Sequence, residues 1–141
     1  MDEAYAIADA GPLVAYLDRR DSYHTWASDQ IALIKRPMLV CEPVLSEAMF
    51  LLGHHSQASE AVLTLVAKGA LKIAFSVNQH LDQLRRLIGE YRSVPMSLAD
   101  ACIVRMAELN DDHMVWTIDS DFSVYRKHGR TPLPLIQPSV R

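Results

Sequence analysis

The sequence has little of what would mark a secreted or membrane-spanning protein. Its two cysteines, Cys41 and Cys102, both lie in apolar contexts, which argues against a disulfide framework and for a reducing compartment. No apolar run is long enough to span a bilayer, because the best stretch, from Ala61 to Phe75, is interrupted by lysines. The acidic start, residues 1–3, lacks the basic and apolar regions of a secretory signal. We therefore expect a cytoplasmic protein.

Positive charge is also scarce. The 14 Lys and Arg residues are outnumbered by 17 Asp and Glu residues, which gives a net charge of −3. A protein that binds nucleic acid through Lys and Arg alone is usually basic, so this chain would need bound cations or a local basic patch. Arginine clusters do occur within residues 19–20, 85–92 and 126–130. Taken singly, each cluster is best interpreted as the solvated face or end of a helix.

The length of 141 residues suits one domain covering residues 1–141. Short, continuously apolar runs predict strands at residues 5–8, 38–41, 71–75, 114–118 and 133–136. Amphipathic or apolar segments between them predict helices at residues 13–17, 22–35, 43–52, 56–68, 78–91 and 97–110, with a turn at Gly11-Pro12. Alternation of this kind indicates an α/β domain whose parallel sheet is covered on both faces. Functional side chains are then expected beyond the carboxyl ends of the strands.

Acidic residues stand at three of these strand ends. Asp9 follows the first strand, Glu42 follows the second, and Glu47 lies on the helix after it. Asp119 and Asp121 follow the strand at residues 114–118. A parallel sheet would bring all of them to one edge of the domain.

A further acid, Asp100, lies in the first turn of the predicted helix at residues 97–110, which is apolar nearly all round and therefore expected to be buried. Helical side chains lean towards the N-terminus, so this carboxylate should project from the start of the helix. The same residue completes a Ser-x-x-Asp sequence with Ser97, which alone favours a capping box.

The other acids have ordinary structural explanations too. Asp9 could begin a turn, Asp119 and Asp121 could cap a short helix, and Glu47 falls on the margin of an apolar helix stripe. Gathered at one edge, however, these carboxylates would repel one another unless a divalent cation lay among them. Mg²⁺ prefers oxygen ligands, keeps several waters, and supplies positive charge that the composition lacks. Such a site suits chemistry on phosphodiesters.

The segments that carry these acids resemble the motifs of the PIN-domain family, and within it the VapC-type toxins. The resemblance covers nearly the whole chain in order and spacing, at residues 7–18 with Asp9, residues 21–24 with Asp21-x-x-His24, residues 42–47, residues 97–101 and residues 116–122. After Asp9 this chain has Ala10-Gly11, whereas many members carry Ala-Ser or Thr-Ser, so no hydroxyl contact is expected beside the first acid.

The resemblance implies a three-layer α/β/α sandwich with a central, mainly parallel sheet of 4–5 short strands. It implies a Mg²⁺-dependent endoribonuclease, in which Mn²⁺ substitutes, that leaves a 5′-phosphate and a 3′-hydroxyl. By position, Asp9, Glu47, Asp100 and Asp119 are the catalytic and metal-binding acids, and Asp121 is an additional ligand. It also implies the toxin of a type II toxin–antitoxin pair, with a cognate antitoxin and a homodimer as partners.

Three further residues are candidates for contact with RNA. Thr117 could orient the acids by hydrogen bonding or be a plain strand residue. His24 is more simply a helix residue, and Arg126 is as well placed for a surface role as for a phosphate contact. The segment Met49 to Leu52 is expected in the core, with a dimer or partner surface as the alternative.

Three other functions stay open at this stage. A PIN-like nuclease that processes RNA outside a toxin system would carry the same acids. A receiver domain or a haloacid-dehalogenase-like phosphatase also uses Asp at parallel strand ends with Mg²⁺, but the expected paired acids at the first strand and the late Lys are missing. A non-catalytic binding module that kept the fold is disfavoured because all the acids are present.

Overall fold

A computed structural model describes residues 4–53 and 56–139. The strands are β1 (Tyr5–Ala8), β2 (Met38–Val40), β3 (Leu71–Ile73), β4 (His113–Trp116), β5 (Arg126–Lys127), β6 (Thr131–Pro132) and β7 (Leu135–Ile136). The α-helices are α1 (Ala10–Leu17), α2 (His24–Leu33), α3 (Glu42–Leu51), α4 (Ser56–Ala67), α5 (Leu81–Glu90) and α6 (Leu98–Leu109). Two short 3₁₀ helices are η1 (Asn78–His80) and η2 (Ser120–Ser123).

Five strands form the central sheet in the order β3-β2-β1-β4-β7, and every pairing in it is parallel. The strands read as apolar runs because helices cover both faces of the sheet, so neither side of the central strands meets water. Residues 6–8 of β1 are fully buried. The predicted parallel sheet of 4–5 short strands is confirmed.

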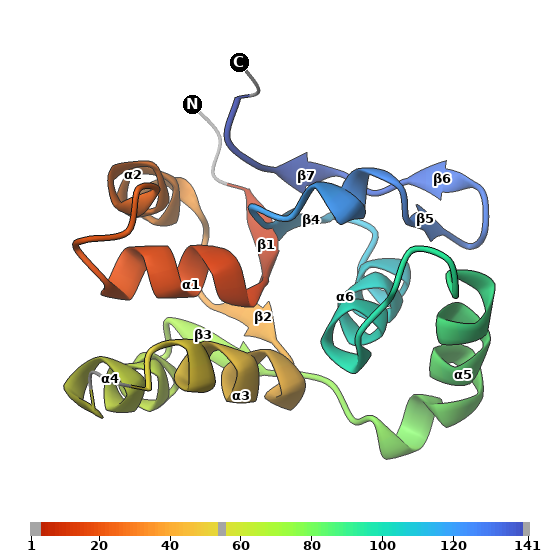
Figure 1. Cartoon of the computed structure of the whole chain (residues 1–141), viewed down its shortest axis with the longest axis horizontal. Coiled ribbons are helices and arrows are strands. Elements are labelled where there is room, and N and C mark those ends of the chain that lie inside the picture. The colour runs from red at the N-terminus through yellow and green to blue at the C-terminus, as the bar shows by residue number, and fades with distance from the viewer. Residues whose placement is uncertain (1–3, 54–55, 140–141) are drawn as a thin grey trace.

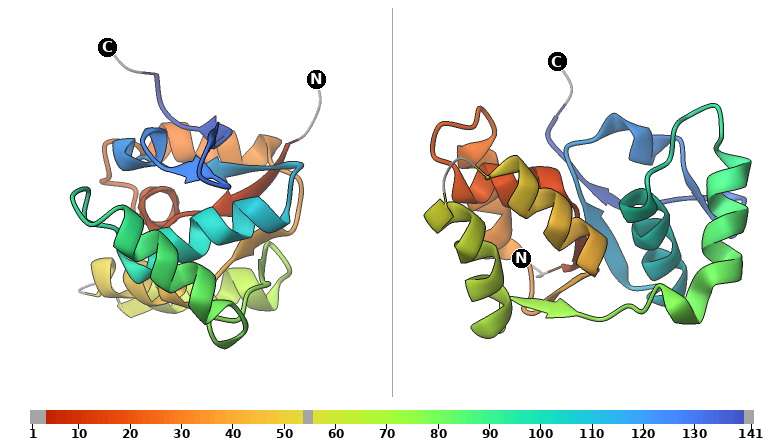
Figure 2. Two further views of the ribbon diagram at one scale, coloured as in Figure 1. Left: turned by 90° about the vertical axis from the view of Figure 1, so that its right-hand side faces the viewer. Right: turned by 60° about the horizontal axis from the view of Figure 1, so that its bottom comes forward.

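The helices form two groups on opposite sides of the sheet (Figures 1 and 2). The group α1 to α4 contacts itself through α1·α2, α1·α3 and α3·α4, whereas α5 and α6 pack against each other. This division follows from the strand order. The chain moves outward from β1 to β3 with its helices on one face, and right-handed crossovers require the opposite face when it returns from β3 to β4. The result is a three-layer α/β/α sandwich.

The core is continuous from one helix layer to the other. Helix α6 is buried between the sheet and α5, with Ala101, Cys102, Ile103 and Val104 fully buried, as its nearly uniform apolar sequence predicts. Its contacts with α3, β1 and β4 fix the helix across the sheet. The N-terminus of α6 is thereby held close to the carboxyl ends of the strands.

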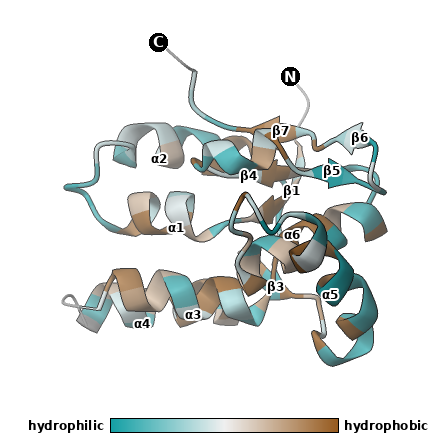
Figure 3. Cartoon of the chain, turned by 45° about the vertical axis from the view of Figure 1, so that its right-hand side comes forward, coloured by the Kyte–Doolittle hydropathy of each residue, from teal (hydrophilic) through white to brown (hydrophobic). Residues whose placement is uncertain are grey.

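Two local expectations were wrong. Gly11-Pro12 does not form a turn before the helix but lies inside the first turn of α1, where proline needs no hydrogen-bonded N–H. The antiparallel hairpin of β5 and β6 was not expected, because its strands are two residues long and polar. In Figure 3, β5 is teal whereas β7 is brown. The hairpin tip has positive φ at His128 and Gly129, which a glycine accommodates readily.

Within residues 4–53 and 56–139, no helix is long and apolar enough to cross a membrane.

Candidate active site

The register between β1 and β4 creates the first half of the site. Ala8 is paired with Trp116, so the next residues, Asp9 and Thr117, emerge side by side at the carboxyl edge of the sheet. Thr117 Oγ1 donates a hydrogen bond of 2.8 Å to Asp9 Oδ2 and accepts one of 2.9 Å from the backbone N–H of Asp119. One hydroxyl therefore positions two of the predicted acids.

Asp9 is the most deeply placed acid of the site, with only 6% of its surface exposed. Its Oδ1 accepts a hydrogen bond of 2.8 Å from the backbone N–H of Ala10, so it caps α1. Burial raises the pKa of Asp9 from 3.8 to about 7, against the lowering effect of the bonds from Thr117 and Ala10. The negative charges of Asp100 and Glu47 raise that pKa further.

Asp100 comes from the N-terminus of α6. Its Oδ2 accepts a bond of 3.1 Å from the N–H of Ser97, while its own N–H donates to Ser97 Oγ at 3.0 Å, so the expected capping box is present. The cap and a site role are compatible, because the cap holds the carboxylate at the helix start. Burial raises the pKa of Asp100, and the charge of Asp119 adds to that rise.

Glu47 and Asp119 complete the group from two other elements. Glu47 lies on the middle of α3, and Asp119 is the N-cap of η2, with its Oδ1 accepting from the N–H of Asp121 at 2.9 Å. Partial burial raises the pKa of Glu47, and the charges of Asp100 and Asp119 raise it as well. Three of the four acids thus resist ionisation, since each lies partly buried and near another anion.

These four acids line one cleft of about 300 Å³, which we call the acid cleft. Its walls are Asp9, Ala10, Gly11, Glu47, Leu51, Asp100, Ile118 and Asp119. The N-terminal ends of α1 and α6 both open onto it, so backbone N–H groups and helix dipoles partly offset the negative charge. The structure therefore brings together acids that lie as far apart in sequence as residues 9 and 119.

Not every candidate acid lines this cleft. Glu42 directly follows the second strand and was therefore an alternative to Glu47 as the acid of that motif. It is exposed in the first turn of α3 and is not among the lining residues. Asp121 is also outside the lining residues, although its backbone N–H holds Asp119 in place. The geometry favours Glu47 over Glu42 and gives Asp121 a supporting position at the rim.

Each of the three candidate substrate contacts has partners within the protein. Thr117 is fully buried, so its hydroxyl positions acids and cannot touch RNA. His24 uses Nδ1 in a bond of 2.8 Å to the carbonyl of Ala15, which ties α2 to α1 away from the cleft. The Nη1 of Arg126 donates to the carbonyls of residues 123, 124 and 125, so this side chain closes the turn after η2.

Tyr125 is a site residue that the sequence did not reveal. Its hydroxyl donates a long bond of 3.4 Å to Asp100 Oδ2, and its ring is fully buried against Phe122 and Tyr91. Burial and the negative charge of Asp100 raise the pKa of Tyr125, so the phenol stays protonated and keeps donating. No motif marked it, because it reaches Asp100 from an irregular segment 25 residues away.

The donor set of the acid cleft fits a hard divalent cation. All four side chains offer carboxylate oxygens, the ligands that Mg²⁺ and Mn²⁺ prefer, and their mutual repulsion is the kind that a bound cation relieves. Across the described ranges, no three acidic, His or Cys side chains already converge closely enough to hold an ion. The carboxylates of Asp9, Asp100 and Asp119 are instead turned towards nearby N–H and O–H donors. Binding a cation would therefore require these side chains to rotate towards one another.

No protein-family model and no curated protein matches the sequence. Among solved structures, the chain is similar to VapC20 of Mycobacterium tuberculosis, a sarcin–ricin loop cleaving toxin, with a TM-score of 0.76 and 16% sequence identity. The match covers 84% of this chain and 93% of that one. The chain therefore has the VapC-type PIN fold, a three-layer α/β/α sandwich, that its motifs predicted.

Proposed function

We propose that this protein is a divalent-metal-dependent endoribonuclease. The observation that carries the proposal is the convergence of Asp9, Glu47, Asp100 and Asp119 on one cleft from four separate elements. The raised pKa values of Asp9, Glu47 and Asp100 show that charge at this cleft is unfavourable, and acids in such a position are retained where function requires them. We infer that the substrate is RNA from the similarity in fold to VapC20, which cleaves the sarcin–ricin loop.

The four acids would hold Mg²⁺ or Mn²⁺. When bound, such an ion lowers the pKa of a coordinated water and stabilises the leaving oxygen of a phosphodiester. Thr117 keeps Asp9 and Asp119 in register with each other through its two hydrogen bonds. The hydroxyl of Tyr125 and the backbone N–H of Ser97 both donate to Oδ2 of Asp100 and so orient its carboxylate. By the family resemblance, the products are a 5′-phosphate and a 3′-hydroxyl.

The cleft argues against the phosphotransfer alternative. Receiver-type sites pair the phosphorylated Asp with a Lys, and no Lys is among the cleft-lining residues of the described chain. Asp9 is also a poor phosphoryl acceptor, because both of its oxygens accept hydrogen bonds and little of it is exposed.

The biological role that we propose is the toxin of a type II toxin–antitoxin pair acting in the cytoplasm, with a cognate antitoxin and a homodimer as partners. The end of α3 supports a partner surface, because Phe50 is 82% exposed and Leu51 is 55% exposed, whereas Met49 and Leu52 of the same segment pack in or against the core as expected. Expression of the wild-type chain should arrest growth, whereas expression of Asp9→Asn should not. Growth arrest by both would contradict a toxin role that depends on cleavage; arrest by neither would favour an RNA-processing nuclease.

Cleavage of an end-labelled RNA hairpin tests the enzymatic proposal. We expect the full chain to cut a sarcin–ricin loop hairpin with Mn²⁺ or Mg²⁺, and to show no cleavage in EDTA. Asp9→Asn and Asp100→Asn should abolish cutting. Glu42→Gln is the matched control, because it removes an exposed carboxylate outside the acid cleft, and it should keep the wild-type rate. Cutting that persists in EDTA would overturn the proposal.

A further inference from the structure

The outer face of α5 carries a strip of residues that the acid cleft does not use. Arg85, Ile88 and Gly89 are spaced by three and four residues, which places them on one side of α5, and Arg92 lies in the turn just after the helix ends at Glu90. Together with Pro95 and Met96 they line a shallow cleft of about 430 Å³. We call it the arginine cleft.

The charge of the arginine cleft is positive throughout. Both arginines are exposed, and in the part of the chain that the structure describes neither forms an ion pair. No acid is among its lining residues. This contrasts with a chain whose net charge is −3 and whose other conspicuous cleft is lined by carboxylates. Two unpaired guanidinium groups over an apolar floor suit phosphate groups, which they bind in a planar, bidentate manner.

Gly89 lies between the two arginines along the chain. It lies inside the helix, where glycine destabilises a helix relative to alanine. A Cβ added to Gly89 would meet only Nη2 of Arg92, at 4.0 Å, which is an ordinary van der Waals contact. The guanidinium of Arg92 therefore lies near Gly89, and an alanine would fit at this position.

The arginine cleft and the acid cleft lie close together along the chain. Its lining residue Met96 is followed by Ser97, whose backbone N–H binds Asp100. The two clefts are thus joined by a chain segment that spans at most about 14 Å from Met96 to Asp100. Figure 1 shows this connection running from the end of α5 to the start of α6. A single-stranded segment of RNA bound at one cleft would reach the other within a few nucleotides.

We propose that the arginine cleft binds the phosphodiester backbone of the RNA substrate next to the phosphate that is cut at the acid cleft. The inference rests on the proposed ribonuclease function and adds a defined substrate-binding surface to it. Its physical basis is that the acid cleft repels a polyanion, so a separate source of positive charge has to hold the strand in place.

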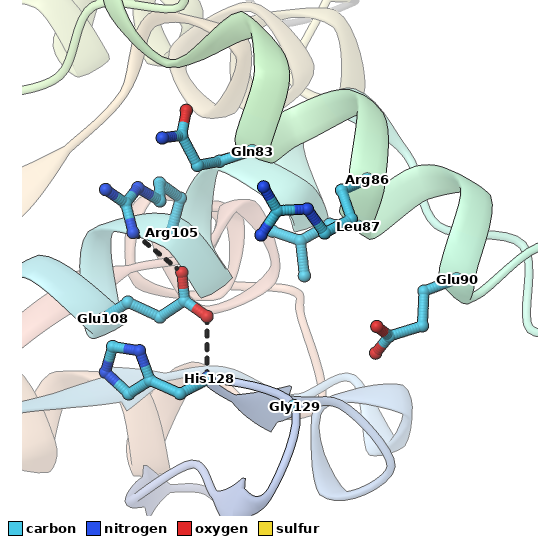
Figure 4. Close-up of a pocket in the computed structure, with 8 residues that line it drawn as sticks. All are labelled: Gln83, Arg86, Leu87, Glu90, Arg105, Glu108, His128 and Gly129. Carbon is cyan, nitrogen blue, oxygen red and sulfur yellow. Dashed lines mark hydrogen bonds and ion pairs between the residues drawn. The ribbon is translucent and has the colours of Figure 1, made fainter.

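The neighbouring arginine, Arg86, provides a matched control on the same helix. Its side chain does not line the arginine cleft but a separate cavity of about 360 Å³, formed by α5, α6 and the β5–β6 hairpin. Figure 4 shows that Glu90 and Glu108 share this cavity, and Glu108 also pairs with Arg105 at 3.1 Å. The positive charges in this cavity are balanced by the two glutamates, so it has no excess positive charge to attract phosphate.

The experiment compares RNA binding by Arg85→Gln/Arg92→Gln and by Arg86→Gln, each in an Asp9→Asn background that prevents cutting. The probe is a fluorescent sarcin–ricin loop hairpin with single-stranded flanks. The double variant should bind roughly 10-fold or more weakly at low salt. Its slope of log Kd against log salt should fall by about 1.4, since each phosphate contact in a single strand contributes about 0.7. Arg86→Gln should stay within about twofold of its parent.

Cleavage assays of the same arginine variants with wild-type Asp9, so that the site can cut, separate this inference from the proposed function. The double variant should raise KM and leave kcat nearly unchanged, because its arginines lie outside the acid cleft. Unchanged binding and KM, or an equal loss in Arg86→Gln, would overturn the inference while leaving the ribonuclease proposal intact. Absence of RNA binding and cleavage in the wild-type chain would overturn both. Circular dichroism of each variant checks that α5 is still folded.

Discussion

Replacing Asp9 with Asn should stabilise the protein while destroying its activity. Burial raises the pKa of Asp9 from 3.8 to about 7, so the folded chain holds this proton more tightly than the unfolded chain does. Between these two pKa values the unfolded carboxyl ionises first, and the free energy of unfolding therefore falls as pH rises. Above pH 7 the raised pKa of Asp9 lowers the free energy of unfolding by its full amount, about 4 kcal/mol. Asn removes that penalty and loses one hydrogen bond from Thr117 or Ala10, about 1 kcal/mol.

At pH 8 the free energy of unfolding of Asp9→Asn should therefore exceed that of the wild type by about 3 kcal/mol. On going to pH 5 this difference should shrink by about 2–3 kcal/mol. Urea denaturation in EDTA at both pH values measures this difference. Glu42→Gln, the same replacement at an exposed acid, should change the free energy of unfolding by less than about 0.5 kcal/mol. A pH-independent difference, or an Asp9→Asn variant less stable than wild type at pH 8, would refute the argument that burial disfavours the anion.

Two further substitutions test the supports of the site and of α6. Thr117→Val leaves Oδ2 of Asp9 without its donor and the N–H of Asp119 without its acceptor, so urea denaturation should show a loss of about 2–3 kcal/mol. In the wild-type chain the hydroxyl of Thr117 lowers the pKa of Asp9, so its loss should raise that pKa and shift the pH profile of cleavage to higher pH. An unshifted profile would argue against this coupling. Glu108→Ala leaves Arg105, whose side chain is 19% exposed, without its acidic partner and with only the bond to Nδ1 of His80, and should destabilise the fold by about 3 kcal/mol. Mn²⁺ binding should be unchanged in that variant, since the pair lies outside the acid cleft.

The sequence predicted the central architecture well, because burial on both faces of a parallel sheet leaves an unambiguous pattern. The run Tyr5–Ala8 coincides with β1, and the apolar segment beginning at Leu98 is a buried helix. The exact ends of the helices were harder to predict. The predicted helix start at Ser22 was early by two residues, because Asp21 Oδ1 accepts from the N–H of Tyr23 and forms a turn before α2 begins. Local hydrogen bonds of this kind compete with helix formation.

The candidate site was predictable to the extent that topology alone decides it. Acids at parallel strand ends had to meet at one edge, and Asp9 and Asp119 do. Side-chain direction was not predictable. Whether Thr117 faced the core or the solvent depended on register, and the three hydrogen bonds of Arg126 depended on a tight turn. Tyr125 could not be found, because its contact with the first turn of α6 arises only from tertiary packing.

The most direct test of the account is a calorimetric titration of Mn²⁺ into the full chain, with Asp9→Asn and Asp119→Asn measured beside it. These two residues come from different strand ends and share the hydroxyl of Thr117. If the carboxylates act as one ligand set, the wild-type chain binds Mn²⁺ and either substitution removes or greatly weakens that binding. Mn²⁺ binding of wild-type strength in both variants would contradict a shared cation site in the acid cleft.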